Sequence, residues 1–284
     1  MKEGKICYLC GHDVFNKREG KVRDNPNLEV FQCVKCGLIF LSSFEHIDDS
    51  FYENSLMHGG AINVKDWEIE TSWDDERRFN YLRKALENKD VLDFGCGNGG
   101  FMMRARNCAA LVEGVEVERR LEAHFRKKKL KVYKNLDEIN NKYDIITAFH
   151  VIEHIKDPVN LLRKLATLLK ENGLIIVEVP NGDDALITLY RCKAFAEFTY
   201  WSCHLFLFND LTIKMLVEKA GLNLMYVKQI QRYPLANHLY WLSFGMPGGH
   251  KKWGFIDSGP LNKEYENALA KLGLCDTLIA GISK

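Results

Sequence analysis

The chain has 284 residues, of which 46% are apolar, and its 39 basic residues nearly balance its 38 acidic ones, giving a formal net charge of +1. That length accommodates one large α/β domain or a medium domain with a small appendage. Six prolines and the absence of low-complexity tracts exclude a mostly disordered or collagen-like chain. The balanced charge argues against a broad polyanion-binding surface, so nucleic acid is not an expected partner.

The distribution of apolar residues indicates a soluble, cytoplasmic protein. Met1 to Lys5 lead into cysteines rather than into the apolar segment of a secretory signal. The longest weakly polar stretch, Leu235 to Gly249, is interrupted by Asn237 and His238 and is too short to span a bilayer. We therefore expect no membrane association, and the sequence leaves the oligomeric state open.

Four of the nine cysteines form two copies of the pattern C-x-x-C-G near the N-terminus. Cys7 and Cys10 make the first pair, Cys33 and Cys36 the second, and 22 residues separate the pairs. Two intervening residues let one tight turn aim both thiolates at a single ion, and four thiolates suit tetrahedral Zn²⁺. We predict a zinc ribbon over residues 1–45, with a structural ion because four protein ligands leave no position for substrate. Buried cysteines without metal, or a redox pair, remain alternatives.

Helices and strands alternate beyond a polar connector at about residues 42–70. A helix is expected from about Trp73 to Glu87, and the segments that follow have the apolar periodicity of short strands and amphipathic helices. Strands are expected at residues 91–94, 111–116, 131–133, 144–149, 174–179, 222–230 and 277–282. One helix is expected between the first glycines and about residue 107, and two more at residues 119–129 and 209–220.

The strongest helical signal begins at Asp157, an acidic N-cap, with Pro158 at the first helical position. Gly173 is expected to end that helix, as a C-terminal glycine does. Seven strands alternating with helices predict an α/β fold with a Rossmann-like sheet that has helices on both faces. Its ligand site should lie at the carboxyl ends of the strands.

Two aromatic-rich segments interrupt this alternation. Residues 182–208 follow the fifth strand, and residues 232–274 separate the sixth strand from the seventh. Both are longer than typical connections, which is consistent with substrate lids. A layer of aromatic packing without a ligand fits equally well.

A glycine-rich turn follows the first strand, in the run from Val91 to Gly100. Glycines let a ligand approach the backbone closely, and the N-terminus of the next helix favours an anionic group. Glu116 lies 19 residues beyond Gly97 at the end of the next strand, where a carboxylate can accept hydrogen bonds from both ribose hydroxyls. A nucleoside-containing cofactor follows, and these features alone leave both NAD and S-adenosylmethionine open.

Four motifs of the chain resemble those of class I S-adenosylmethionine-dependent methyltransferases. They are motif I at residues 91–99, with its acidic residue two before the first glycine, and segments 114–116, 143–158 and 173–181, which resemble the second, fourth and fifth strand regions. The resemblance covers about residues 75–230 in the correct order and implies a methyltransferase domain over residues 46–284. The N-terminal ribbon resembles one found ahead of some bacterial sugar-modifying methyltransferases.

The resemblance also implies which residues hold the cofactor. They lie in the loops after the first four strands: Asp93, Gly95, Cys96 and Gly97 at the methionine portion, Glu116 at the ribose, Asn135 and Leu136 beside the adenine, and Phe149 and His150 near the sulfonium.

Methyl transfer from a sulfonium is an in-line displacement, for which the protein must orient the nucleophile and exclude water. A hydroxyl nucleophile also benefits from a base near neutral pH. His150, Glu153 and His154 are the candidate catalytic residues, with His150 favoured as the base or as a substrate-orienting group. Their spacing also resembles a metal-binding pattern, and some family members with a Glu-His pair here use a divalent ion.

The expected acceptor is a small molecule for O-methylation: a sugar, a nucleotide-linked sugar or a capsule precursor in polysaccharide biosynthesis. Aromatic faces bind sugar rings and nucleobases, so Tyr200, Trp201 and His204 are the candidate substrate contacts. O-methylation is expected rather than C-methylation. The sugar C-methyltransferases with a similar ribbon carry a further C-terminal domain, and the given sequence has no counterpart to it. An RNA base methyltransferase and a noncatalytic cofactor-sensing protein remain alternatives.

Overall fold

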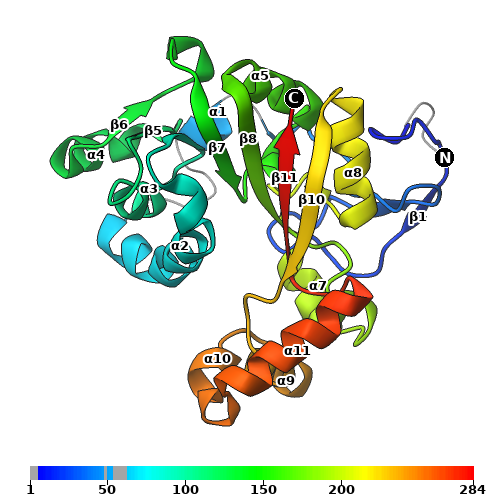
Figure 1. Ribbon diagram of the computed structural model, residues 1–284. Helices are drawn as coiled ribbons and strands as arrows, with labels where there is room; N and C mark the ends of the chain where they lie inside the picture. The colour runs from blue at the N-terminus through cyan, green and yellow to red at the C-terminus, as the bar shows by residue number, and fades with distance from the viewer. Residues whose placement is uncertain (1–5, 48–49, 54–62) are drawn as a thin grey trace.

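The computed structural model describes residues 6–47, 50–53 and 63–284 and arranges them around two β-sheets. The larger sheet has seven strands in the order β10-β11-β8-β7-β4-β5-β6, and the smaller has four in the order β1-β2-β3-β9. Figure 1 shows the larger sheet through the centre of the molecule, with helices on both of its faces. This arrangement confirms the predicted Rossmann-like α/β fold.

Five strands of the larger sheet run parallel to one another. They are β4 (Asp90–Phe94), β5 (Leu111–Val115), β6 (Lys131–Tyr133), β7 (Tyr143–Phe149) and β8 (Leu169–Pro180). Parallel strands bring their carboxyl ends to one edge of a sheet, so the loops after β4, β5 and β7 meet there. β10 (Asn223–Ile230) and β11 (Thr277–Ser283) complete the sheet, and β11 runs antiparallel to both of its neighbours.

The strand residues alternate between two hydrophobic cores, one on each face of the sheet. Val91 and Ile145 pack in one core with Leu86 of α2 (Val64–Leu86) and with α3 (Gly100–Ala105). Leu92 and Ile146 pack in the other core with α5 (Pro158–Thr167) and α8 (Asp210–Lys219). This period of two is the reason that helices cover both faces.

Shorter helices occupy the connections of the larger sheet. η2 (Arg119–Leu121) and α4 (Glu122–Lys128) lie between β5 and β6, η3 (Leu136–Glu138) follows β6, and η4 (Ile152–His154) follows β7.

Two predicted boundaries are wrong. α5 ends at Thr167, and Gly173 lies inside β8, where a Cβ would come within 3.1 Å of the carbonyl oxygens of Lys170 and Tyr143. Close backbone approach, and not the end of a helix, therefore requires glycine at this position. α2 begins at Val64 rather than near Trp73, because Asn63 caps it and its first turns lack an apolar stripe that periodicity could detect.

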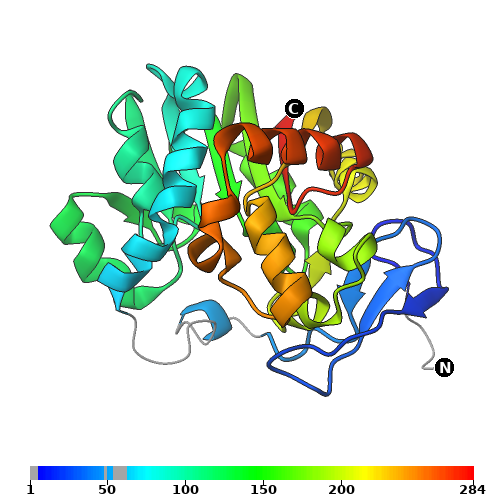
Figure 2. The ribbon, with the colours of Figure 1, turned by 90° about the horizontal axis from the view of Figure 1, so that it is seen from below.

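The smaller sheet combines the N-terminal segment with a strand from far along the chain. β1 (Phe15–Lys17), β2 (Val30–Cys33) and β3 (Ile39–Leu41) pair antiparallel, and β3 also pairs with β9 (Phe206–Leu207). α1 (Ser50–Glu53) follows in the chain. Figure 2 shows the N-terminal strands beside the segment that contains α7 (Lys193–Thr199). The 182–208 insertion thus completes the ribbon's sheet.

The second insertion folds into helices below the sheet in the view of Figure 1. They are α9 (Leu235–Phe244), α10 (Gly249–Lys252), η5 (Gly254–Ile256) and α11 (Gly259–Leu272). The first insertion contains the short helix α6 (Ala185–Thr188) as well as α7. The ring of Trp241 lies 5.2 Å from both Phe195 and Phe198, centroid to centroid. These contacts join the two insertions and favour the aromatic packing layer over a pair of lids.

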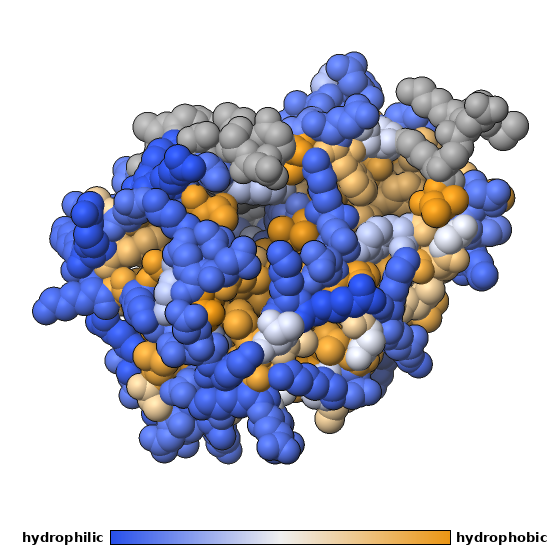
Figure 3. All heavy atoms as spheres, turned by 90° about the horizontal axis from the view of Figure 1, so that it is seen from above, coloured by the Kyte–Doolittle hydropathy of each residue, from blue (hydrophilic) through white to orange (hydrophobic). Residues whose placement is uncertain are grey.

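The surface seen from above is mostly hydrophilic around its periphery, with apolar side chains between the charged ones toward the centre (Figure 3). Among the described helices, none combines the length and the apolarity needed to cross a membrane.

Candidate functional site

A cavity of about 670 Å³ opens at the carboxyl ends of β4, β5 and β7. Its wall includes the loops after these strands, at residues 95–98, 116–118 and 150–151, together with side chains of α2. The volume lies within the range of about 300–1,000 Å³ that small-molecule sites occupy. The cavity is therefore the candidate functional site, at the edge of the sheet that the sequence predicted.

The glycine loop after β4 is closed against the end of β5. Gly95 and Gly97 have positive φ angles of 71° and 52°, and a Cβ at Gly95 would lie 2.5 Å from Cγ2 of Val151. The Gly97 N–H donates to Oε2 of Glu116 at 2.8 Å, and the Glu118 N–H donates to Oε1 at 3.0 Å. The partly buried carboxylate of Glu116 thus holds the loop, and loss of solvent around it raises its pKa.

Asp93 lies one residue before the end of β4, lines the cavity and is almost fully buried. Its Oδ1 accepts a hydrogen bond from the hydroxyl of Thr147 at 2.7 Å. Burial raises the pKa of Asp93 to about 7, although the Thr147 bond opposes the rise. The carboxyl group is therefore poised to lose a proton near neutral pH.

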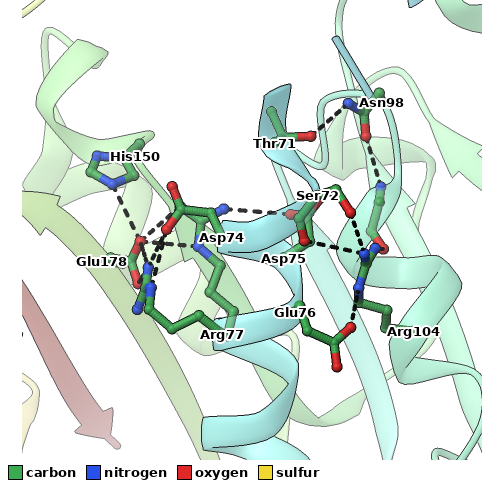
Figure 4. Close-up of polar contacts among 12 residues, drawn as sticks. Thr71, Ser72, Asp74, Asp75, Glu76, Arg77, Asn98, Arg104, His150 and Glu178 are labelled. Atoms are coloured by element: carbon green, nitrogen blue, oxygen red, sulfur yellow. Dashed lines mark hydrogen bonds and ion pairs between the residues drawn. The ribbon is translucent and has the colours of Figure 1, made fainter. Parts of the chain in front are cut away.

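α2 carries polar side chains in two directions, toward Glu178 on one side and toward Asn98 on the other, as Figure 4 shows. On one side, Arg77 bonds to both Asp74 and Glu178, with N–O distances of 2.9 Å. On the other side, the Thr71 hydroxyl accepts from Asn98 of the glycine loop at 3.0 Å. α2 therefore connects the glycine loop with the end of β8.

His150 lies between two buried carboxylates just beyond β7. Its Nδ1 is 3.2 Å from Oε1 of Glu153, and its Nε2 is 3.2 Å from Oε1 of Glu178. Burial lowers the pKa of His150, but the hydrogen bonds to Glu153 and Glu178 outweigh burial and the pKa lies above its ordinary value. Because both ring nitrogens face carboxylates, the charged imidazolium is the form that this geometry favours.

The charges around His150 balance when the imidazole is protonated. Four carboxylates and three guanidinium groups surround it, and they belong to Asp74, Asp75, Glu153, Glu178, Arg77, Arg78 and Arg232. We call this set, with His150, the ionic cluster. An uncompensated buried charge is costly, so its balance favours the charged histidine.

Arg232 of the ionic cluster comes from the start of the second insertion. Its side chain bonds both oxygens of Asp74, and its Nη1 lies 3.1 Å from Nε2 of His150. The Arg232 N–H donates to Oδ1 of Asp276 at 3.0 Å, which fixes the backbone. Sequence reasoning missed Asp74, Arg232 and Glu178, because their partners lie about 100 residues or more away along the chain.

A second group of possible ligands stands beside the cavity. One ligand atom each from Glu153, His154 and His204 lie within 4.8 Å of one another. Oε2 of Glu153 and Nδ1 of His154 are buried and find no hydrogen-bond partner among the described residues. Burial lowers the pKa of His154, and it lowers that of His204 to about 3, so both rings are neutral. This donor set is suited to a divalent ion.

The four N-terminal cysteines converge as the sequence predicted. The Sγ atoms of Cys7 and Cys36 are 3.5 Å apart, as are those of Cys10 and Cys33, and all four lie within 4.8 Å of one another. Tetrahedral Zn–S bonds of about 2.3 Å would set the sulfur atoms about 3.8 Å apart. The arrangement therefore fits a Zn²⁺ ion.

The cavity collects eight of the predicted cofactor, catalytic and substrate residues and leaves six outside. Its lining includes Asp93, Gly95, Cys96, Gly97, Glu116, Phe149, His150 and His154, and the fully buried Glu153 bonds to His150 behind it. Asn135 caps η3 and Leu136 packs in a core. Tyr200 accepts from Nε of Arg18 at 2.8 Å, and the Trp201 ring lies under Arg23. These four and His204 do not line the cavity, so the contacts expected of them stay predictions.

The family model described as a methyltransferase domain matches residues 68–227, more than half of the chain. The chain belongs to the methyltransferase-domain family. This membership confirms the class of enzyme that the four motifs resemble, an S-adenosylmethionine-dependent methyltransferase.

Curated relatives of this methyltransferase act on different kinds of acceptor, by their names. A tRNA U34 carboxymethyltransferase from Campylobacter hominis is 28% identical over 156 residues, which cover 46% of this chain and 55% of the relative. A ubiquinone biosynthesis O-methyltransferase from Coxiella burnetii is 24% identical over 176 residues, which cover 56% of this chain and 75% of the relative. The chain thus spans little more than half the length of the tRNA-modifying relative.

Solved structures share the fold of the methyltransferase. A SAM-dependent methyltransferase from Thermotoga maritima, described as a possible histamine N-methyltransferase, has a TM-score of 0.52 at 17% identity and covers 85% of this chain and 100% of its own. The magnesium protoporphyrin IX methyltransferase of Synechocystis, with bound SAH, has a TM-score of 0.51 at 12% identity and covers 82% of this chain and 96% of its own. At these identities the likeness concerns the fold alone.

Proposed function

We propose that the chain transfers a methyl group from S-adenosylmethionine to a small-molecule acceptor inside the cavity. The observation that carries the proposal is the closure of the positive-φ glycine loop on the carboxylate of Glu116, at the carboxyl ends of β4 and β5. S-adenosylmethionine supplies, when bound, an electrophilic methyl group on a sulfonium. The residues described below bind it, orient the acceptor and exclude water.

The cofactor contacts follow from the wall of the cavity. We assign the methionine portion to Asp93, Gly95, Cys96 and Gly97, the ribose to Glu116 and the sulfonium end to Phe149. Val117 and Glu118 follow Glu116 directly and line the cavity, whereas Asn135 and Leu136 do not, so we assign the adenine to Val117 and Glu118. The border at Asn135 and Leu136 that the resemblance implied stays a prediction beside this assignment.

His150 has an orienting role in this proposal rather than that of a general base. A base must offer a lone pair to the acceptor, and both nitrogens of His150 face the carboxylates of Glu153 and Glu178. The imidazolium also neutralises the ionic cluster at the cavity wall. An acceptor hydroxyl would therefore lose its proton to another group or to solvent.

The charge of the lining supports a small acceptor over RNA. Among the described residues, seven carboxylates and three Lys or Arg side chains line the cavity. A carboxylate-rich wall attracts the cationic sulfonium and repels a polyanion. A sugar or nucleotide-linked sugar remains our proposed acceptor, and the tRNA-modifying relatives make RNA the second candidate.

A calorimetric titration with S-adenosylhomocysteine, the demethylated product, tests the proposal. We expect saturable binding, and we expect Glu116→Ala to weaken it at least about tenfold, because the loop and the ribose lose one shared acceptor. Glu171→Ala, an exposed position on β8, is the matched control and should bind normally. Labelled S-adenosylmethionine offered with nucleotide-sugars, capsule precursors and RNA then identifies the acceptor. Metal-replete protein that binds no S-adenosylhomocysteine would contradict the assignment.

We propose further that the four cysteines hold a structural Zn²⁺ and that Glu153, His154 and His204 hold a second divalent ion. The second ion would supply a Lewis acid beside the cavity. Two buried, unpartnered donor atoms support it. Metal analysis after Co²⁺ or Mn²⁺ loading should find about one ion beyond the thiolate-bound one. His204→Leu should lose that ion, whereas His238→Leu, a buried histidine elsewhere, should keep it.

A further inference from the structure

The first cysteine pair reaches the cavity wall through one side chain. Tyr8, between Cys7 and Cys10, donates its hydroxyl hydrogen to Oδ1 of Asp157 and accepts from the backbone N–H of Val159 at 3.0 Å. Asp157 lines the cavity, although 149 residues separate it from Tyr8. One phenol therefore joins the four-cysteine cluster to the wall of the candidate site.

The bond to Tyr8 is part of the start of α5. Oδ1 of Asp157 also accepts from the N–H of Asn160 at 3.1 Å, which makes Asp157 the N-cap. The N–H of Val159, which the helix itself leaves unpaired, is satisfied by the Tyr8 hydroxyl. Loss of the phenol would therefore remove two hydrogen bonds, to Asp157 and from the Val159 N–H, that fix the turn between the cavity and α5.

Tyr8 is also held by two other elements. Its ring lies 5.3 Å from that of Phe206 in β9, centroid to centroid. Nζ of Lys219 in α8 lies 5.1 Å from the ring centroid and donates to the Tyr8 carbonyl oxygen. These contacts hold the ring in place, and the direction of its hydroxyl depends on the backbone turn that carries the cysteines.

The ribbon touches the same wall by a second route. The Leu41 N–H of β3 donates to the Leu205 carbonyl at 3.1 Å, and the Leu205 N–H donates to the Glu153 carbonyl at 2.9 Å. Nε2 of His46 lies 2.7 Å from the Ser202 carbonyl. The strands of the ribbon therefore support η4, whose His154 lines the cavity.

We propose that Tyr8 is a positioning residue that couples metal occupancy of the four cysteines to the cavity wall at residues 154–157. The turn from Cys7 to Cys10 shares the apolar core of the ribbon through Cys7 and Leu9, and the ion would add the thiolate bonds that fix the shape of the turn. Without the ion the turn loses its fixed backbone, the phenol leaves Asp157, and the wall loosens. The effect on cofactor affinity rests on the proposed function, whereas the effect on the wall does not.

Hydrogen exchange tests the coupling in the intact chain. Tyr8→Phe keeps the ring and its contacts with Phe206 and Lys219, so any change reports the loss of the two hydroxyl hydrogen bonds. We expect it to retain its zinc, to speed exchange of the amides of residues 157 and 159–161 at least about fivefold, and to weaken S-adenosylhomocysteine binding about three- to fivefold. Val34→Ala, at the equivalent position of the second pair and exposed, is the matched control and should change neither.

Chelation completes the test. Stripping zinc from the wild-type protein should speed exchange at 157–161 as Tyr8→Phe does, and stripping it from Tyr8→Phe should add less than about twofold there. Equal acceleration by chelation in both proteins, or none in the wild type, would overturn the proposal. If no form binds S-adenosylhomocysteine, the proposed function fails, and the exchange measurements still decide the coupling.

Discussion

The two walls of the cavity hold their charges in different ways. On the wall after β4 and β5, the carboxylates of Asp93 and Glu116 meet backbone N–H groups and one hydroxyl, without a paired cation among the described residues. Behind the wall after β7, the buried carboxylate of Glu178 is surrounded by Arg77, Arg78 and His150. The first wall leaves negative character free for a cationic ligand, and the second neutralises itself.

The largest effect should follow from removing the central carboxylate of the ionic cluster. Glu178→Gln leaves two guanidinium groups and the imidazolium of His150 buried without the negative charge that they share. We expect a loss of about 3–5 kcal/mol in the free energy of unfolding, measured by urea denaturation. Glu171→Gln, exposed on the same strand, should stay within about 0.5 kcal/mol of wild type. A loss below about 1 kcal/mol for Glu178→Gln would mean that the second wall is hydrated and not self-neutralising.

The carboxyl group of Asp93 should make the first wall sensitive to pH. Burial raises its pKa from 3.8 to about 7 in the folded protein. Between these values the unfolded chain ionises first, so the folded state binds more protons and loses stability as the pH rises. Asp93→Asn keeps an acceptor for Thr147 and removes the ionisation.

The measurement is the free energy of unfolding of cofactor-free wild type and Asp93→Asn at several pH values. We expect the free energy of unfolding of the variant to rise relative to that of wild type by up to about 1.4 kcal/mol per pH unit between pH 4 and pH 7, or about 2–4 kcal/mol in total. The difference should be constant below and above that window. Asp137→Asn, an exposed control, should show no such trend. A flat difference for Asp93→Asn would show that the first wall does not desolvate its carboxylate.

The two walls also differ in how far the sequence predicts them. Asp93, Gly95 and Glu116 lie within one strand–turn–helix–strand stretch, and their order along it indicated their common edge. Asp157 and Pro158 likewise predicted the start of α5 from local chemistry. Such features depend on neighbours in sequence, so a pattern of residue types can reveal them.

The second wall depends on pairs that no local pattern encodes. Arg232 meets Asp74 across 158 residues, and Arg78 meets Glu178 across 100. In the sequence, Asp74 and Arg78 look like the solvated face of a charged helix. Their burial is decided by the packing of α2 over the sheet, and the role of Tyr8 is equally invisible without the fold.

The smallest effect concerns the contact by which α2 links the walls. The Thr71 hydroxyl accepts from Nδ2 of Asn98 at 3.0 Å and donates to the Trp67 carbonyl at 3.1 Å. Thr71→Val keeps the shape and removes both bonds, and Asn98→Ala removes one of them together with the Asn98 bond to the Gly100 N–H. A double-mutant cycle isolates the shared bond, and we expect a coupling of about 0.5–1.5 kcal/mol. Ser72→Ala, which removes a separate bond from Arg104, should instead add to Thr71→Val without coupling. Zero coupling between Thr71 and Asn98 would mean that their hydrogen bond does not help to hold α2 against the glycine loop.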